Sequence, residues 1–332
     1  MAGIAKGLAR RIGRALFYSL EKYRLLMGRR AGQNLGRRFG SLWYRLLRLD
    51  TKRLVDVRTN LRRMEPTLTD GEADALIRRV CRHWGLFLLE GMGQTLLPGK
   101  PALARDMAEI RGIQRLRAAH AQGKGVILAT AHFGHFELAN SLLALDGFPI
   151  SSVIRTVDDP WVDATIDRIR TATGSVTIKK ESAARDILKA LRQQRIVAIN
   201  VDQNAAFNHV FTPFFGELAA TFATPAVLGL RTGAPVLPMF CAYDDATDRW
   251  IVTIHPPIDS PGTGDKDADI RYVTTRINAA MERAIRQTPE QWLWIHRRWK
   301  TRPDPVDIEA YERESAFLTA RLGPGWEAPT AP

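Results

Sequence analysis

VILATAHFGHFELAN, residues 126–140, is the stretch that decides the fold. Its first six residues form a short, continuous apolar run, which is typical of a strand buried on both faces of a sheet. The residues from Phe136 onward predict a helix that extends to about residue 146. A buried strand that leads through a short turn into a helix is the unit from which α/β folds are assembled.

The same alternation continues toward the C-terminus. The strand-like runs are residues 150–154, 175–178, 196–201 and 236–241. The helical stretches between them are about 159–172, 181–193 and 222–231. We therefore predict an α/β fold with a mostly parallel central sheet flanked by helices. An edge strand is expected at residues 250–254 and a further helix at about 266–287.

Helices are also predicted before this alternation begins. Thr69 and Glu72 have the spacing of a capping box, which predicts a helix from there to about Gly91. A helix of about twenty residues is expected after Pro101.

The first 63 residues are strongly basic. They hold 17 Lys or Arg residues against three acids, while the rest of the chain is net −1, so the whole formal charge of +13 originates here. Apolar side chains recur every four residues from Ile4 to Leu20, which predicts a basic amphipathic helical region over residues 4–48, interrupted at Gly36 and Gly40. Such a helix can lie in the headgroup layer of an anionic membrane. The alternative is an ordinary helix with a solvated charged face.

The composition narrows the class of protein. Hydrophobic residues make up 45% of the 332 residues and charged residues 25%, which excludes collagen-like and disordered chains. Cys81 and Cys241 cannot form a disulfide framework by themselves, so a reducing compartment is expected. No apolar run is long enough for a membrane-spanning helix, and the N-terminus does not resemble a secretory signal. The tail from Gly323 is expected to be disordered.

His132 is the candidate catalytic residue. It follows the first buried strand, and sites in open α/β sheets form beyond the carboxyl ends of strands. From the turn before the helix, its ring could fold back to Glu137, whose carboxylate would orient the imidazole and leave the other nitrogen free to take a proton. Gly134 would let the backbone pass closely, and the helix start offers N–H groups to a developing oxyanion.

Other interpretations of this segment stay open. His132, His135 and Glu137 could bind zinc or iron, although they do not share one helical face. A histidine at the end of a strand can also be purely structural. The chain has no Gly-x-Ser-x-Gly elbow and no phosphate loop. If His132 acts, we expect it to activate a hydroxyl or a water directly, without a covalent enzyme intermediate.

Five ordered segments carry a resemblance. The first is His132-x4-Glu137, and the others are residues 154–160 with Arg170-x3-Gly174, 201–203 with 211–216, 231–238 and 289–303. Together they resemble the lipid A biosynthesis (late) acyltransferase family over about residues 10–305, within the superfamily of HX4(D/E) lysophospholipid-acyltransferase-like proteins. HX4E alone is shared by many glycerolipid acyltransferases, whereas the ordered set is specific.

The resemblance implies roles for individual residues. His132 would be the general base and Glu137 its orienting partner. Arg170, at the Arg-x3-Gly position, would bind the acyl carbonyl oxygen or a substrate phosphate, and Arg168 is its near neighbour. Asp202 would be a site acid that positions the active-site side chains.

Further residues are implied to bind substrate. They are Arg155, Gln203, Phe214, Phe215, Gly216, Trp294, Arg297 and Arg298. Residues 214–216 would shape the acyl pocket, with plain core packing as the alternative. Packing and surface charge are the alternative for the last three.

The resemblance also implies the reaction. A fatty acyl chain would pass from the thioester of acyl carrier protein to a hydroxyl of a lipid A precursor, or a related saccharolipid or lipid, without a metal or organic cofactor. The enzyme would act at the cytoplasmic face of the bacterial inner membrane. Many relatives begin with a more hydrophobic anchor, so the basic N-terminal region here predicts peripheral attachment. An acidic carrier protein and a phosphorylated lipid both suit that region. A thioesterase and a non-enzymatic basic membrane-binding protein are the alternatives, and nucleic acid is not an expected partner.

Three regions are predicted along the chain. Residues 1–97 form the basic helical region, residues 98–305 the catalytic α/β domain, and residues 306–332 a C-terminal helix with a disordered tail.

Overall fold

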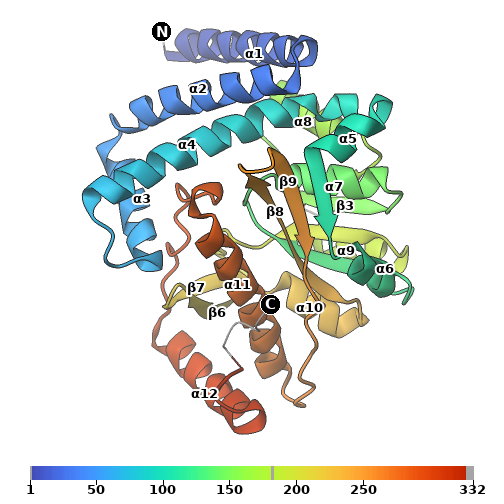
Figure 1. The fold of residues 1–332 in the computed structure, drawn as a ribbon. Coiled ribbons are helices and arrows are strands. Elements are labelled where there is room, and N and C mark those ends of the chain that lie inside the picture. The colour runs from blue at the N-terminus through green and yellow to red at the C-terminus, as the bar shows by residue number, and fades with distance from the viewer. Residues whose placement is uncertain (1, 181–182, 327–332) are drawn as a thin grey trace.

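The computed structural model describes residues 2–180 and 183–326, without the side chains of residues 2–12, 16 and 183. Seven of its strands form one sheet in the order β1-β9-β8-β2-β5-β3-β4 (Figure 1). Their bounds are β1 Ala108–Arg111, β2 Val126–Thr130, β3 Ile150–Ile154, β4 Val176–Lys179, β5 Ile196–Asn200, β8 Val236–Asp244 and β9 Arg249–Ile254.

Most strand pairs of this sheet are parallel. Strand β2 pairs in parallel with β5 and β8, and β3 pairs in parallel with β4 and β5. The hairpin between β8 and β9 is antiparallel, and β1 then pairs in parallel with β9. The prediction of an α/β fold with a mostly parallel central sheet is confirmed.

The helices between the strands also match the prediction. They are α7 Phe136–Leu145, α8 Pro160–Thr171, α9 Ala183–Arg192 and α10 Thr224–Thr232. Residues 181–182 of the third predicted helix lie outside the described residues. Helix α4 (Asp70–Met92) begins with the predicted capping box of Thr69 and Glu72, and α11 spans Lys266–Gln287. The connecting 3-10 helices are η1 (Gly93–Gly99) and η3 (Pro289–Gln291), and α12 (Pro305–Leu322) follows.

The helix predicted after Pro101 is wrong in its length. The segment divides into α5 (Pro101–Met107), strand β1 and α6 (Ile113–His120). Strand β1 pairs with β9, so residues 250–254 are not at the edge of the sheet as predicted. The alanines and arginines of this segment favour a helix, and pairing with β9 overrides that local preference.

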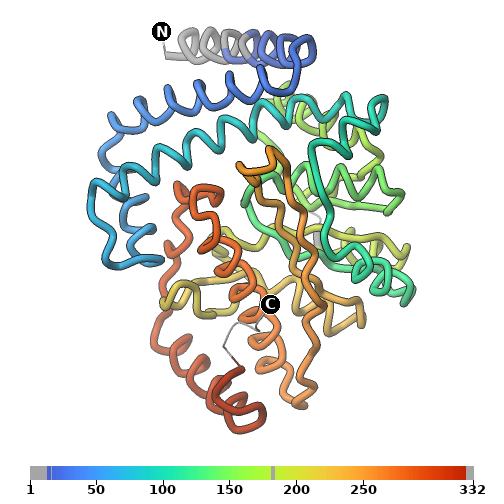
Figure 2. Tube along the Cα trace, in the orientation of Figure 1, coloured from blue at the N-terminus to red at the C-terminus, as the bar shows by residue number. Residues whose placement is uncertain are grey.

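The interruptions predicted at Gly36 and Gly40 are also wrong. Helix α1 (Ala2–Leu26) ends before Gly28, and α2 (Arg29–Leu47) runs through both glycines without a break. They lie against α4, where a Cβ on Gly40 would be 2.2 Å from the Cys81 carbonyl oxygen. Helices α2 and α4 therefore run side by side in close backbone contact (Figure 2). Helix α3 (Thr51–Met64) connects them in the sequence.

A hairpin of β6 (His209–Phe214) and β7 (Glu217–Phe222) was not predicted. Its two-residue loop is Phe215-Gly216, with φ values of +50° and +77°. Two positive φ angles are the signature of the type I′ turn, which matches the twist of a hairpin.

The buried core joins the first two predicted regions. One cluster contains Leu61 and Ile77 from the N-terminal helices together with Ile127 and Val197 of the sheet. The division at residues 97 and 98 therefore stays a prediction. Trp326 is buried against α12, whereas residues 327–332 of the predicted disordered tail lie outside the described residues.

Within the described residues, none of the helices has both the length and the hydropathy needed to cross a bilayer.

Candidate active site

Strand register brings His132 and Asp202 together. In the parallel pair of β2 and β5, Thr130 lies opposite Asn200. His132 and Asp202 each follow two residues after this last pair, so both leave the sheet at the same edge. Loops at the carboxyl ends of parallel strands are where α/β folds form their sites.

The Asp202 carboxylate holds the His132 ring in one orientation. His132 Nδ1 lies 2.9 Å from Asp202 Oδ1, and the His132 backbone N–H donates to Oδ2 at 3.0 Å. Trp292 Nε1 donates to the same Oδ2 at 2.9 Å. Because Nδ1 faces a carboxylate, it carries the proton, and Nε2 presents its lone pair toward Asn200 Nδ2, 3.4 Å away.

Burial and charge act in opposite directions on this pair. Burial lowers the pKa of His132, but the charge and hydrogen bond of Asp202 outweigh it, so the pKa lies above its ordinary value. Burial raises the pKa of Asp202, and the His132 charge and three donated hydrogen bonds outweigh that effect, so the carboxyl stays ionised. Asp202 is only 2% exposed.

We expected the Glu137 carboxylate to orient the His132 ring. In the structure it hydrogen-bonds Arg170 instead. Its Oε1 accepts from Arg170 Nε at 2.8 Å and from Arg170 Nη2 at 2.5 Å. Glu137 lies in the first turn of α7 and Arg170 in the last turn of α8, so the ion pair joins the two helices. The position that the resemblance gave to Glu137 is occupied by Asp202.

These residues line a pocket of about 1010 Å³. Of the predicted site residues, His132, Glu137, Arg155, Arg170 and Gln203 line it, and Asp202 lies directly behind His132.

Arg168, in contrast, lies outside the pocket lining. It points to α1, where its Nη2 donates to Glu21 Oε1 at 2.5 Å. The structure thus places Arg170 at the pocket and Arg168 at a helix interface.

The other predicted substrate residues are not brought to the pocket. Phe214 and Phe215 are buried among Trp292, Trp294 and Trp299, and Gly216 is the second residue of the hairpin turn.

Arg297 and Arg298, which the resemblance also implied to bind substrate, have partners away from the pocket. Arg298 is fully buried and donates to the Ala220 carbonyl oxygen and the Thr221 hydroxyl. Arg297 pairs with Asp56 on the surface. For Trp294 and these two arginines, the structure shows packing and ion pairing.

Sequence reasoning missed several polar groups of the pocket. Asn140 Nδ2 donates to the Ser152 hydroxyl at 3.1 Å, and both residues line the pocket beside Asn200. Asn140 lies one turn after Glu137 on the same face of α7, so helical periodicity was the available signal. Trp292 lay within the resemblance but carried no sign of its contact with Asp202.

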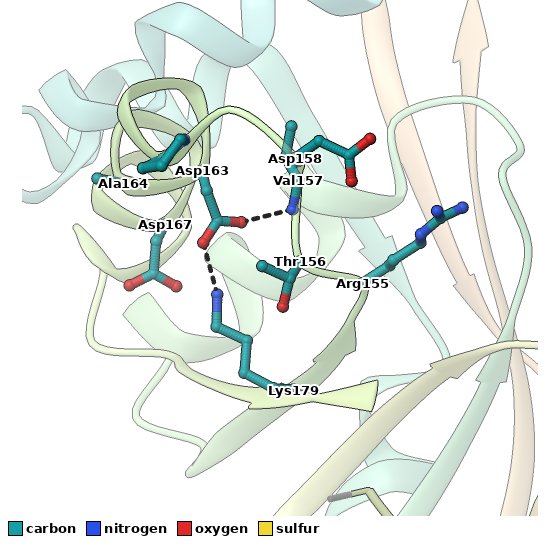
Figure 3. A pocket seen from close by; sticks show the side chains of 9 residues that line it. Arg155, Thr156, Val157, Asp158, Asp163, Ala164, Asp167 and Lys179 are labelled. Atoms are coloured by element: carbon teal, nitrogen blue, oxygen red, sulfur yellow. Dashed lines mark hydrogen bonds and ion pairs between the residues drawn. The ribbon is translucent and has the colours of Figure 1, made fainter. Parts of the chain in front are cut away.

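Arg155 lies between this pocket and a smaller hollow of about 520 Å³ beside α8. In that hollow, Asp163 accepts from the Val157 backbone N–H and from Lys179 Nζ, both at 2.9 Å (Figure 3). The Arg155 side chain extends away from this cluster (Figure 3). Its guanidinium is therefore available at the mouth of the large pocket.

His135 does not join His132 in a metal-binding arrangement. It is fully buried, its Nδ1 accepts from the Leu138 backbone N–H, and burial lowers its pKa to about 3. In the described part of the chain, no three or more His, Cys, Asp or Glu residues are grouped as ligands for a metal ion.

The start of α7 supplies hydrogen-bond donors near His132. The backbone N–H groups of Gly134 and His135 donate to Gln291 and Cys241, and that of Leu138 donates to the His135 ring. The first intrahelical bond is from Ala139 to His135, so the N–H groups of Phe136 and Glu137 precede it. Both of these residues line the pocket.

The chain is similar to known proteins over most of its length. Residues 15–301 match the family described as bacterial lipid A biosynthesis acyltransferase. The chain is 28% identical to the lipid A biosynthesis lauroyltransferase of Escherichia coli (strain K12), over 78% of this chain and 83% of that protein. It is 27% identical to the palmitoleoyltransferase of the same strain, over 81% of this chain and 85% of that protein.

A third relative is a lipid A biosynthesis acyltransferase of Haemophilus influenzae (strain ATCC 51907 / DSM 11121 / KW20 / Rd). It is 25% identical over 84% of this chain and 88% of that protein. The family match covers most of the chain and includes every residue of the site described above. The chain therefore belongs to the bacterial lipid A biosynthesis acyltransferase family and is an acyltransferase that acts on lipid A.

Proposed function

We propose that the protein transfers a fatty acyl chain from the thioester of acyl carrier protein to a hydroxyl of a lipid A precursor, with His132 as the general base. The observation that carries this proposal is the contact of His132 Nδ1 with a buried carboxylate at the wall of a pocket of about 1010 Å³. That contact leaves Nε2 as the basic atom on the pocket side.

In the proposed step, Nε2 takes the proton of the acceptor hydroxyl as its oxygen attacks the thioester carbonyl carbon. The tetrahedral intermediate then collapses, the carbon–sulfur bond breaks, and the imidazolium returns the proton to the departing thiolate. Asp202 stabilises the imidazolium and holds its tautomer. Two buried cysteines, Cys81 and Cys241, have pKa values raised by burial, so they are poor nucleophiles for a covalent route.

Arg170 is proposed to stabilise the oxyanion, together with the N–H groups of Phe136 and Glu137. Its guanidinium lines the pocket, and Glu137 fixes its direction through two hydrogen bonds to one oxygen. Donors that are already oriented toward developing charge lower the barrier without reorganising during the reaction. Glu137 thus acts on the reaction through Arg170.

The surroundings of the pocket suit anionic partners. Arg155, Lys180 and Arg185 line it and are exposed at its mouth. An acidic carrier protein and a phosphorylated acceptor would both be attracted to this rim, which accelerates encounter. With the basic N-terminal helices, this supports peripheral attachment to the cytoplasmic face of the inner membrane.

The test uses the purified full-length protein with acyl-loaded carrier protein and a lipid A precursor. Mass spectrometry is expected to show the precursor gaining the mass of one acyl group per thioester consumed. Release of free fatty acid without acylated lipid would contradict transfer and support thioester hydrolysis. A parallel reaction with acyl-coenzyme A tests the donor, because equal rates with both donors would contradict the carrier-protein assignment.

A further inference from the structure

Helix α2 has three faces with different chemistry. Gly36, Gly40 and Leu47 are buried against the rest of the protein, as expected from the contact with α4. Arginines gather on a second face, and apolar side chains occupy a third. At 3.6 residues per turn, the centres of the three faces are roughly 120° apart. Only the buried face contributes to packing of the fold, so the basic face and the apolar face need another explanation.

The basic face of α2 is largely unpaired. Its arginines are Arg30, Arg37, Arg38 and Arg45 of the helix, together with Arg48 at the C-cap. Among the described residues, only Arg37 has partners, through a 3.1 Å hydrogen bond to the Tyr243 hydroxyl and a 3.8 Å ion pair with Asp245. These five like charges, on one side of the helix and its C-cap, repel one another unless an anion lies between them.

Helix α4 adds further arginines beside this face and creates a hollow. Asn34, Arg37, Arg38, Ser41 and Arg82 line a space of about 420 Å³. Arg37 and Arg82 also border an adjoining space of about 300 Å³, which Arg79 and His83 line as well. The close contact at Gly36 and Gly40 is what brings Arg38 and Arg82, from two helices, to one hollow.

Charge and hydrogen bonding in the hollow favour an anion. Four arginines face two acids, Asp245 and Glu290, and the ion pair of Arg79 with Glu290 is long at 3.9 Å. Arg82 forms no ion pair or hydrogen bond with any described side chain. Guanidinium groups recognise phosphate through paired hydrogen bonds.

The third face of α2 shows where such a phosphate would come from. Phe39, Leu42 and Leu46 are spaced by three and four residues, and Leu42 and Leu46 are 51% and 57% exposed. Leu49 continues the stripe beyond the helix end. A helix with an exposed apolar stripe next to a basic face is suited to the boundary between lipid tails and headgroups.

We infer that the hollow between α2 and α4, lined by Arg37, Arg38, Arg79 and Arg82, binds the phosphate group of an anionic membrane lipid while the Phe39–Leu46 stripe lies in the bilayer surface. The inference deepens the proposed membrane attachment and rests on it, but not on the proposed chemistry. No residue that lines the catalytic pocket lines this hollow. An acidic carrier protein is the other class of partner, and it would have no use for the apolar stripe.

The experiment measures binding of the full-length protein to phosphatidylcholine vesicles with and without phosphatidylglycerol. The test variant is Arg38→Ala with Arg82→Ala, because both side chains are exposed and their loss leaves the core intact. The charge-matched control is Arg117→Ala with Arg231→Ala, on α6 and α10 at the other end of the molecule (Figure 1). We expect the test variant to lose about thirtyfold in affinity for phosphatidylglycerol vesicles and the control to keep the wild-type value.

Competition separates a phosphate site from general charge attraction. Inorganic phosphate is expected to displace wild-type protein from these vesicles better than chloride at equal ionic strength, and this difference should disappear in the Arg38/Arg82 variant. Equal vesicle binding by wild type, test variant and control would overturn the site. So would a variant that binds vesicles normally but loses affinity for acyl carrier protein. Failure of the wild type to bind any vesicle would instead contradict the membrane attachment itself.

Discussion

At the scale of single residues, the protonation of His132 is controlled by the Asp202 carboxylate, which hydrogen-bonds its ring. Asp202 accepts three hydrogen bonds in a buried position, from the His132 ring, the His132 backbone and Trp292. A general base must be neutral, so the rate of transfer should rise with pH through an ionisation above the ordinary imidazole pKa of about 6.5.

Replacing Asp202 with Asn tests this control. The substitution removes the charge that raises the pKa of His132 and leaves burial, which lowers it. The acid limb of the pH–rate profile should therefore move to lower pH, and the rate at its plateau should fall about 100-fold because the imidazolium loses its counter-charge. The profile of kcat/KM against pH measures both effects.

Glu137→Gln is the matched comparison for Asp202→Asn. Glu137 also raises the pKa of His132 by its charge, but less than Asp202 does. The acid limb of the pH–rate profile should therefore shift less in Glu137→Gln than in Asp202→Asn. The activity of Glu137→Gln should still fall, because the contact that orients Arg170 is lost. A larger shift in Glu137→Gln would show that Glu137, and not Asp202, is the partner of the imidazole.

The two arginines of α8 make a second internal comparison. Arg170→Ala should reduce kcat by about 100-fold, since one donor to a developing oxyanion is worth that much. Arg168→Ala removes only the contact with Glu21 of α1 and should leave kcat near the wild-type value. Steady-state kinetics of both variants checks this, and the reverse ranking would contradict the assignment of Arg170.

The residues of this site could be predicted from the sequence better than their contacts could. His132, Glu137, Arg170 and Asp202 all fall at the site, because strand ends and motif spacing locate them. Their pairing depends on which strands are neighbours, and Asp202 is 70 residues away from His132 in the sequence. Local spacing favoured Glu137, whereas the register of β2 and β5 favours Asp202.

At the scale of elements, the contact between α2 and α4 depends on glycine. A Cβ on Gly40 would lie 2.2 Å from the Cys81 carbonyl oxygen, and one on Gly85 would lie 2.1 Å from the Gly36 carbonyl oxygen. Neither backbone can move away without separating the helices. The same glycines hold the arginines of the two helices around one hollow.

Gly40→Ala should therefore destabilise the protein by about 1–3 kcal/mol, the usual range for overpacking. Gly71→Ala is the control, because Gly71 lies in the first turn of α4 with no atom within 4 Å of an added Cβ. That change should be neutral or stabilise by about 0.5–1 kcal/mol. Denaturant unfolding measures both, and equal stability of the two variants would contradict the packing argument.

Elements with a strong local signal were predicted well, and those determined by distant partners were not. The capping box of Thr69 and Glu72 located the start of α4, and the apolar runs located β2 to β5 and β8. Strand β1 was missed because its residues have no strand signal and gain their conformation by pairing with β9. Gly36 and Gly40 were interpreted as helix breakers because close helix packing leaves no mark in a single sequence.

At the scale of the whole molecule, the N-terminal helices are part of the fold as well as a candidate membrane surface. Helix α1 contacts α8 through Arg14 with Asp159 and Glu21 with Arg168, and α2 covers α4. Deleting residues 1–48 would expose α4 and confound loss of membrane binding with loss of stability. Substitutions on the exposed faces of α2 are therefore the cleaner test of attachment.

The central claim is that His132 is the general base for the transfer of an acyl chain to lipid A by this protein. The most direct measurement is mass spectrometry of lipid A from cells that lack their own copy of the gene and carry either the wild-type protein or His132→Ala. With both proteins folded and present in equal amount, we predict that only the wild type adds the mass of one acyl chain. The same added acyl chain in cells with His132→Ala would contradict the claim.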